Sequence, residues 1–326
     1  MSKEVITEMK QSMKLPVIMA PMFLVSNPKM IIQACKAGIV GTFPALNART
    51  GDILEDWMVQ ITEELEQLKH NSPDQMAAPW GINFITHRSN KRYEEDLKLI
   101  KKYKPPVVIT SLGDPSPVVK IAHEYGGIVF SDVINIKFAK KAIEKGTDGL
   151  VLVSSGAGGH GGALNPFAFL SEVREFWDGP IILAGGMSKG EDVLAAEILG
   201  ADFVYMGSRF IPAIESSAQD AYKEMILDAN IEDIIYTDAF SGVKANYLIP
   251  SIINAGLDPQ KLEKKEEINF DKSSGELKAW KDVWGAGQGV GSIKKIQSVS
   301  EIVRELEKSY EDAVENISKQ QSKARL

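Results

Sequence analysis

Eight short, nearly continuous apolar runs recur along the first two thirds of the chain. Runs of this kind, bounded by turn residues, are typical of strands that are covered on both faces. Amphipathic stretches separate the runs, and strands that alternate with helices predict a parallel α/β fold. The apolar runs lie at residues 16–22, 39–45, 80–85, 107–112, 127–133, 149–155, 180–184 and 201–206.

The amphipathic stretches between these runs predict seven helices. Several are followed by a glycine, as helix C-termini prefer: Gly38, Gly126, Gly146 and Gly200. Eight strands with seven intervening helices predict a (β/α)8 TIM barrel, which needs about 250 residues. An open doubly wound sheet is the alternative, but no dinucleotide-type glycine fingerprint follows the first run.

The strand rhythm ends after Arg209, and a glycine-rich run stands at 284–291. We predict a barrel made of residues 1–210 plus about 292–326. Residues 211–291 would form a small, mainly helical domain inserted after strand 8, with a glycine-rich flap over the barrel mouth. Within it, residues 211–285 show no clear strand. An amphipathic helix from about residue 300 to 317 would supply the eighth helix of the barrel.

The composition excludes several classes of protein. The chain has 326 residues, 44% of them apolar, and can bury a large core. A net charge of −7 argues against a nucleic-acid or anionic-membrane surface. The single cysteine, Cys35, excludes a disulfide framework and fits a reducing compartment. We found neither a signal peptide nor an apolar run of about 18 residues, so we expect a cytoplasmic protein with no membrane partner.

Glycines or small polar residues end the last three predicted strands. Open backbone N–H groups with helix starts close behind them bind anions. In barrels, a phosphate site commonly forms from the loops after strands seven and eight. We therefore predict a phosphate-bearing ligand at Gly185, Gly186, Gly207 and Ser208, although these residues would equally permit tight turns.

His160 stands between two pairs of glycines, in the run Gly158-Gly-His160-Gly-Gly162. Its sequence neighbours cannot pack it, so we expect it to project into the barrel mouth. The near-neutral pKa of histidine suits proton transfer or a hydrogen bond to an anionic substrate. The alternative is an exposed loop histidine. No His, Cys or Asp grouping has metal-ligand spacing, so we expect no metal.

Two further polar residues lie in or at the end of predicted strands. Asn83 interrupts a buried run and needs hydrogen-bond partners, which a heterocycle edge or a neighbouring strand would supply. Asp132 closes the fifth strand, and an acid at that end of a barrel strand more often faces the site.

Two other segments are candidates for lining the ligand site. Pro21, Met22 and Phe23 follow the first strand and could line a flat ring system, although barrel packing explains them equally. Trp284 and Gln288 lie in the glycine-rich run, which is either a flap that contacts substrate or a linker to the last helix.

With these motifs the chain resembles the nitronate monooxygenases, formerly called 2-nitropropane dioxygenases, which are FMN-dependent (β/α)8-barrel enzymes. The motifs run in family order across residues 16–291, and the ordered set is specific to the family. They are Pro16-Val-Ile-Met-Ala-Pro-Met22, Gly81-Ile-Asn83, Ala157-Gly-Gly-His160-Gly161, Ala184-Gly-Gly186, Gly200-Ala-Asp202, Met206-Gly-Ser-Arg-Phe210 and Trp284-Gly-Ala-Gly-Gln288.

The resemblance implies FMN as cofactor and His160 as the catalytic group, either a base towards nitroalkanes or a hydrogen-bond donor towards nitronates. The substrates would be an alkyl nitronate, such as propionate-3-nitronate, and O2, and the products a carbonyl compound and nitrite. A homodimer is compatible with these features. The residues implied to contact FMN are Pro21, Met22, Phe23, Asn83, Gly158, Ala184, Gly185, Gly186, Gly207 and Ser208.

Asp132 departs from the family pattern. Some relatives have a basic residue at the end of strand five, near the part of the flavin that becomes negative on reduction. A carboxylate there would oppose an anionic flavin unless it is paired or turned away. We therefore predict Asp132 as an FMN contact from its position at the strand end, although the resemblance does not support this contact.

Other readings stay open. Flavin reductases of the same fold, of the enoyl-acyl-carrier-protein reductase or NADH:quinone reductase type, share these motifs, although an acidic chain fits an acyl-carrier partner less well. A phosphate-binding barrel without flavin would place a lysine or glutamate at a strand end, and no lysine ends a predicted strand. A flavin-binding protein without turnover is the third alternative.

Overall fold

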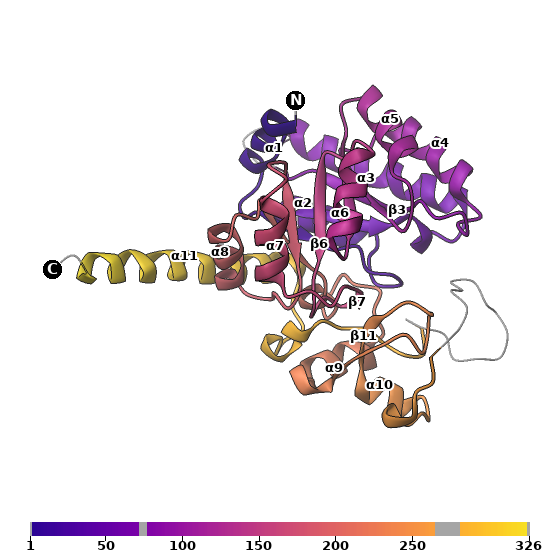
Figure 1. Cartoon of the computed structure of the whole chain (residues 1–326). Helices are drawn as coiled ribbons and strands as arrows, with labels where there is room; N and C mark the ends of the chain where they lie inside the picture. Colours follow the sequence, from indigo (N-terminus) through magenta and orange to yellow (C-terminus); the bar gives the residue numbers. More distant parts are fainter. Residues whose placement is uncertain (1, 72–76, 265–280, 325–326) are drawn as a thin grey trace.

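The computed structural model describes residues 2–71, 77–264 and 281–324. Eight parallel strands close into a barrel in which each strand pairs with the next, and the last pairs with the first (Figure 1). The prediction of a TIM barrel is confirmed. The barrel strands are β1 Val17–Met19, β2 Val40–Pro44, β3 Trp80–Ile85, β4 Val107–Ser111, β5 Ile128–Val133, β6 Gly149–Val153, β8 Ile181–Ala184 and β9 Phe203–Met206.

Helices connect the strands and form the outer layer. The helix α11 Val299–Ala324 packs against α8 and α2, where the eighth helix of the barrel belongs. That expectation is confirmed, although the helix extends beyond residue 317 (yellow in Figure 1). The connecting helices are α2 Pro28–Ala37, α3 Gly51–Asn71, α4 Tyr93–Tyr103, α5 Ser116–Glu124, α6 Ile136–Glu144, α7 Pro166–Arg174 and α8 Gly190–Ile198.

Local sequence signals set the ends of these helices. The side chain of Asn27 accepts a hydrogen bond from the Met30 N–H at the start of α2, and Asn135 caps α6 in the same way. Helix α2 ends at Gly38, whose φ of +94° is left-handed and strained for other residues. The other three glycines predicted to follow helices also have positive φ: Gly126, Gly146 and Gly200.

Helix α1 Ser2–Gln11 closes the amino end of the barrel. Ile6 and Met9 are buried in a cluster with inward-facing side chains of the barrel strands. Lys10 Nζ lies 3.3 Å from Asp202 Oδ1, directly before β9. Access to the barrel interior is therefore from the carboxyl ends of the strands.

The segment after β9 contains strands, so the expectation of no strand between residues 211 and 285 is wrong. Strands β10 Ile234–Thr237 and β11 Ala245–Leu248 form an antiparallel sheet with β7 Gly159–His160, from the loop after β6. Each strand is too short to show a sequence period, and β7, one of the two partners of β11, is over 80 residues away in the chain. The boundaries predicted for a separate domain stay a prediction.

The same segment also contributes the helices α9 Asp220–Asp228 and α10 Ile249–Asn254. Figure 1 shows α9, α10 and β11 at the end of the barrel where β7 lies. Because β7 belongs to the glycine-rich loop after β6, this sheet connects the inserted segment to the predicted site.

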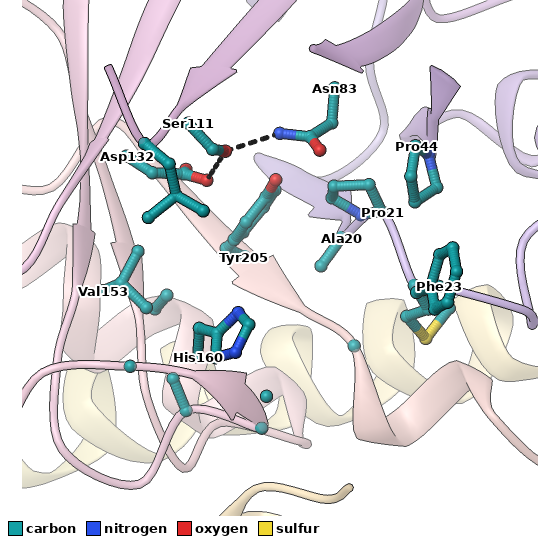
Figure 2. A pocket seen from close by; sticks show the side chains of 18 of the residues that line it. Ala20, Pro21, Phe23, Pro44, Asn83, Ser111, Asp132, Val153, His160 and Tyr205 are labelled. Carbon is teal, nitrogen blue, oxygen red and sulfur yellow. Dashed lines mark hydrogen bonds between the residues drawn. The ribbon is translucent and has the colours of Figure 1, made fainter. Parts of the chain in front are cut away.

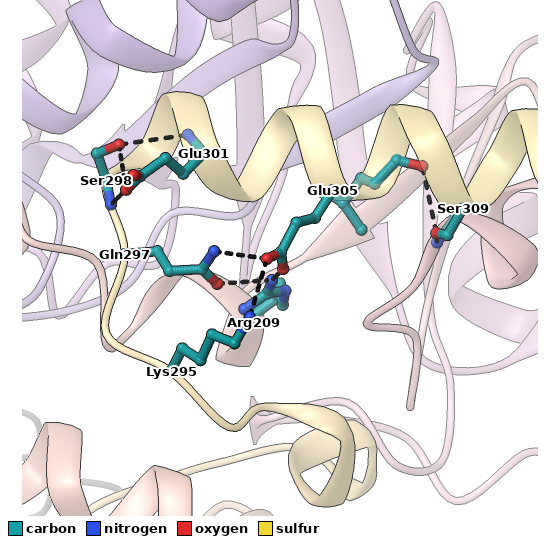
Figure 3. A network of polar contacts seen from close by, with 9 residues as sticks. Arg209, Lys295, Gln297, Ser298, Glu301, Glu305 and Ser309 are labelled. Atoms are coloured by element: carbon teal, nitrogen blue, oxygen red, sulfur yellow. Dashed lines mark hydrogen bonds and ion pairs between the residues drawn. The ribbon is translucent and has the colours of Figure 1, made fainter.

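A polar network holds α11 to the loop after β9 (Figure 3). Arg209 is buried, and its Nη2 donates to Glu305 Oε2 at 2.8 Å and to Gln297 Oε1 at 3.3 Å. Gln297 Nε2 donates to Glu305 Oε1 at 2.7 Å, and Lys295 Nζ lies 3.7 Å from the same oxygen. The network ties the last helix to the end of the last barrel strand.

Within the described residues, no helix is long and apolar enough to cross a membrane. Over the same part of the chain, no group of three or more His, Cys, Asp or Glu side chains is arranged to hold a metal ion.

Candidate functional site

A cavity of about 1400 Å³ opens at the carboxyl ends of the barrel strands. The loops that follow all eight barrel strands line it, together with parts of the inserted segment. Cavities that bind small molecules usually measure about 300–1,000 Å³, so this one has room for more than one small ligand.

Most of the predicted site residues line this cavity. Those that do are Pro21, Met22, Phe23, Asn83, Asp132, Gly158, His160, Ala184, Gly186, Gly207 and Ser208. Within the described part of the chain, Gly185, Trp284 and Gln288 are not among the lining residues. Sequence positions far apart therefore converge at one end of the barrel, as the strand-end pattern predicts.

The glycine-rich run packs backbone against backbone on the predicted phosphate loops. The Gly287 N–H donates to Ser208 Oγ at 2.7 Å, and the Gln288 N–H donates to Gly156 O at 2.8 Å. A Cβ on Gly289 would lie 2.5 Å from Gly186 O. Gly186 itself has a φ of +71°, with nothing within 4 Å of where its Cβ would be. The loops are thus tightly packed on the side that contacts the glycine-rich run, and they are open where Gly186 faces the cavity.

Trp284 and Gln288 lie around this contact rather than in the cavity. The Trp284 ring stacks on Tyr222 with 4.9 Å between ring centroids, and its Nε1 donates to Lys281 O. Gln288 is exposed, although its backbone N–H is bonded to the loop after β6. Tyr222 lines the cavity in place of the tryptophan. A role for Trp284 and Gln288 in contacting substrate stays a prediction.

One wall of the cavity is the loop after β1. The predicted first strand ended at Met22, but β1 ends at Met19, which leaves Pro21, Met22 and Phe23 in a loop. Asn47 fixes this loop, because its Nδ2 donates to Met22 O and its Oδ1 accepts from the Leu24 N–H, each at 3.0 Å.

His160 lies on β7 and faces the cavity (Figure 2). Its Nε2 is 2.8 Å from the Oγ of Ser241, a residue of the inserted segment that also lines the cavity. Burial lowers the pKa of His160 to about 4, because a charged ring would lose its hydration. The imidazole is therefore neutral near pH 7.

The hydroxyl of Ser241 indicates which His160 nitrogen carries the proton. Ser241 Oγ also lies 3.0 Å from Val243 O, which can only accept. When the Ser241 proton points to that carbonyl, Nε2 of His160 donates to Ser241, and the basic lone pair is on Nδ1. Sequence reasoning missed Ser241, because nothing around it in the chain marks it as a partner of His160.

A chain of polar side chains lies elsewhere on the cavity wall (Figure 2). Asn83 Nδ2 donates to Ser111 Oγ at 2.7 Å, and Ser111 Oγ donates to Asp132 Oδ2 at 2.5 Å. The neighbouring strand β4 thus accepts the hydrogen bonds that the Asn83 amide donates, which was one of the two explanations that the sequence left open. Burial raises the pKa of Asp132, and the hydrogen bond from Ser111 partly offsets this effect, so that the resulting pKa is about 7. Tyr205 of β9 also lines the cavity and was not predicted.

Solved structures of other proteins share the fold of this chain. FabK from Thermotoga maritima superposes with a TM-score of 0.76 at 23% identity, over 97% of this chain and 98% of that one. Nitroalkane oxidase from Streptomyces ansochromogenes gives a TM-score of 0.72 at 19% identity, over 94% of this chain and 99% of that one. At these identities both show the fold alone.

Sequences of other proteins also match this chain, and they show its family as well as its fold. A nitronate monooxygenase from Neurospora crassa is 28% identical, over 92% of this chain and 90% of its own length. The family model for nitronate monooxygenase matches residues 4–309, which include every element that lines the cavity. The chain therefore belongs to the nitronate monooxygenase family, a family of flavin-dependent oxidoreductases.

Proposed function

We propose that this protein is an FMN-dependent nitronate monooxygenase that oxidises alkyl nitronates, such as propionate-3-nitronate, with O2. The products are a carbonyl compound and nitrite. The observation that carries the proposal is that His160, a half-buried imidazole that is neutral near pH 7, lines the same cavity as the glycine loops after β8 and β9.

The residues around the cavity fit a flavin mononucleotide. Space is open in front of Gly186, where a phosphate would lie beside Gly207 and Ser208. Gly185, the fourth residue predicted to hold the phosphate, does not line the cavity. Pro21, Met22 and Phe23 offer an apolar wall for the ring system, and Asn83 and Asp132 offer a polar edge. Gly158 and Ala184 would lie against the same ligand. When bound, FMN supplies the redox chemistry, taking electrons from the nitronate and passing them to O2.

His160 has two uses in this reaction. Towards a neutral nitroalkane, the lone pair of the imidazole accepts the proton from the carbon next to the nitro group, which produces the nitronate. Towards a nitronate that arrives already ionised, His160 would act in its other tautomer, in which Ser241 Oγ donates to Nε2 and the Nδ1–H donates a hydrogen bond to the anion. Burial keeps His160 neutral for both uses.

A second candidate is an NAD(P)H-dependent flavin reductase of the same fold. The volume of about 1400 Å³ favours it, because a small nitronate would leave much of the space beside FMN unfilled. The two functions differ in the electron donor, so they are separated by reduction of the flavin in the absence of oxygen.

The absorption spectrum of the purified protein is the first test. An FMN-like spectrum supports the flavin and excludes a barrel without one. The protein is then mixed anaerobically with propionate-3-nitronate or with NADH. We expect the nitronate to bleach the flavin, and O2 to restore the colour with release of nitrite. Bleaching by NADH and not by the nitronate would replace our first candidate with the reductase.

A further inference from the structure

Two buried polar atoms on the cavity wall have no hydrogen-bond partner among the described residues. They are Asp132 Oδ1 and the hydroxyl of Tyr205. Both residues line the cavity, and they come from β5 and β9 (Figure 2). Buried polar atoms are nearly always hydrogen-bonded, because leaving one without a partner costs about 1–3 kcal/mol. Two of them in one cavity indicate a ligand that supplies the missing partners.

The directions of the hydrogen bonds show which oxygen of a protonated Asp132 would carry the proton. Asn83 Nδ2 donates to Ile109 O and to Ser111 Oγ, so both of its protons are used. Ser111 then has one proton, and it is donated to Asp132 Oδ2. A proton held by the carboxyl therefore sits on Oδ1, the oxygen without a partner.

The surroundings of Asp132 favour its protonated form more strongly than those of an exposed carboxyl do. No ion pair joins Asp132 to a cation within the described residues, where Lys141 and Lys145 of α6 line the same cavity and Lys145 pairs with Asp114 at 3.2 Å. The groups around the carboxyl are the Ser111 hydroxyl on β4, Val151 on β6, which pairs with Asp132 in the sheet, and Tyr205 on β9. Burial without a counter-charge raises the pKa of Asp132 to about 7.

We propose that the protonated Asp132 carboxyl is a hydrogen-bond donor to the cofactor, and that its Oδ1–H and the Tyr205 hydroxyl bind acceptor atoms on the polar edge of the flavin ring. The proposal rests on the FMN binding proposed above. A protonated carboxyl donates a hydrogen bond and has no charge to oppose the reduced flavin.

A consequence is that the affinity for reduced flavin depends on pH. Above the pKa of Asp132, the carboxylate loses its donor and repels the negative charge of the reduced ring. His160 does not titrate in this range, because its pKa is about 4. Tyr205 does not either, because burial and the nearby Asp132 hold its pKa well above the usual value.

The test is a spectroscopic redox titration of the FMN-loaded protein between pH 6 and pH 8.5. It gives the ratio of the dissociation constants for reduced and oxidised FMN. Direct titration of the FMN-free protein with oxidised FMN gives the second constant, so the affinity for reduced FMN follows from the two measurements. The variant Asp132→Asn keeps a donor that cannot ionise. We expect it to match the wild type at pH 6 and to bind reduced FMN about tenfold more tightly than the wild type at pH 8.5.

Tyr205→Phe is the matched second variant. It removes a donor that does not titrate, so it should weaken binding of reduced FMN by the same factor at every pH. Equal ratios for wild type and Asp132→Asn across the whole range would overturn the proposal. So would weaker binding by Asp132→Asn at pH 6. If the chain takes up no FMN at all, the proposed function fails with it, whereas normal FMN uptake with a pH-independent ratio defeats only the role of Asp132.

Discussion

His160 Nε2 and Ser241 Oγ lie 2.8 Å apart, although 81 residues separate them in the chain. The pairing of β7 with β11 brings them together, with His160 opposite Ala245. A histidine base needs the right ring orientation and the right tautomer to accept a proton from a substrate. The inserted segment supplies the Ser241 hydroxyl, which bonds to the His160 ring and influences both.

Ser241→Ala should therefore slow oxidation of a neutral nitroalkane by about tenfold while FMN stays bound, because the ring loses its orientation. Ser241→Thr keeps the hydroxyl and should retain most of the activity. The measurement is kcat and kcat/KM at several pH values, with the flavin content of each variant. An equal loss of activity in the alanine and threonine variants would show that the packing of Ser241, and not its hydrogen bond to His160, affects the rate.

His160→Asn should keep FMN bound and lower turnover of a neutral nitroalkane at pH 7 by about tenfold or more. The pKa of His160 is lowered to about 4, so the base is already unprotonated at pH 6 and loses activity only as the pH falls towards 4. The wild-type kcat/KM should thus show no inflection from His160 between pH 6 and 8. A fall in activity centred near the ordinary histidine pKa of about 6.5 would contradict this account.

Asp132→Asn should stabilise the FMN-free protein at pH 8 relative to the wild type. The folded-state pKa of Asp132 is raised to about 7 from an ordinary value of 3.8, so the folded protein holds this proton more tightly than the unfolded chain. The wild type therefore loses stability as the pH rises from about 4 to 7, and the asparagine variant has no such loss. Urea denaturation at pH 5 and pH 8 measures the difference, which should grow with pH. A constant difference would mean that Asp132 ionises normally.

Glu305→Ala should destabilise the protein by about 1–3 kcal/mol, because it removes the carboxylate partner of a buried Arg209. Glu305 is itself 46% exposed, which places the cost below that of a fully buried pair. Asp312→Ala on the same helix breaks the exposed pair with Lys308 and is the control, with an expected change below about 0.5 kcal/mol. Thermal unfolding compares the two, and similar effects would show that Arg209 does not depend on Glu305.

Gly289→Ala should weaken FMN binding and lower the melting temperature. Its Cβ would lie 2.5 Å from both Gly186 O and Ser188 Oγ, so the glycine-rich run would have to move off the loop after β8. Gly291→Ala is the matched control, since its Cβ would be 3.7 Å from the nearest atom, Asn230 Cα. Titration of the FMN-free variants with FMN measures the effect. Normal affinity in Gly289→Ala would separate this contact from the cofactor site.

The sequence by itself determined the barrel and the place of its site. Continuous apolar runs are what strands buried on both faces require, and their count and spacing fixed eight strands with alternating helices. The C-terminal ends of parallel strands meet at one face, so glycines and His160 at three strand ends had to converge. The four glycines after helices followed from backbone sterics alone.

Only the tertiary structure decided the partners of the site residues. Ser241 reaches His160 through two strands of four residues or fewer, which leave no periodic pattern in the sequence. The protonation of Asp132 depends on burial and on the absence of a nearby cation among the described residues, neither of which a local motif encodes. Hydrogen bonds and desolvation depend on atoms brought together across the barrel, and for that reason the fold had to form before the chemistry of His160 and Asp132 could be assigned.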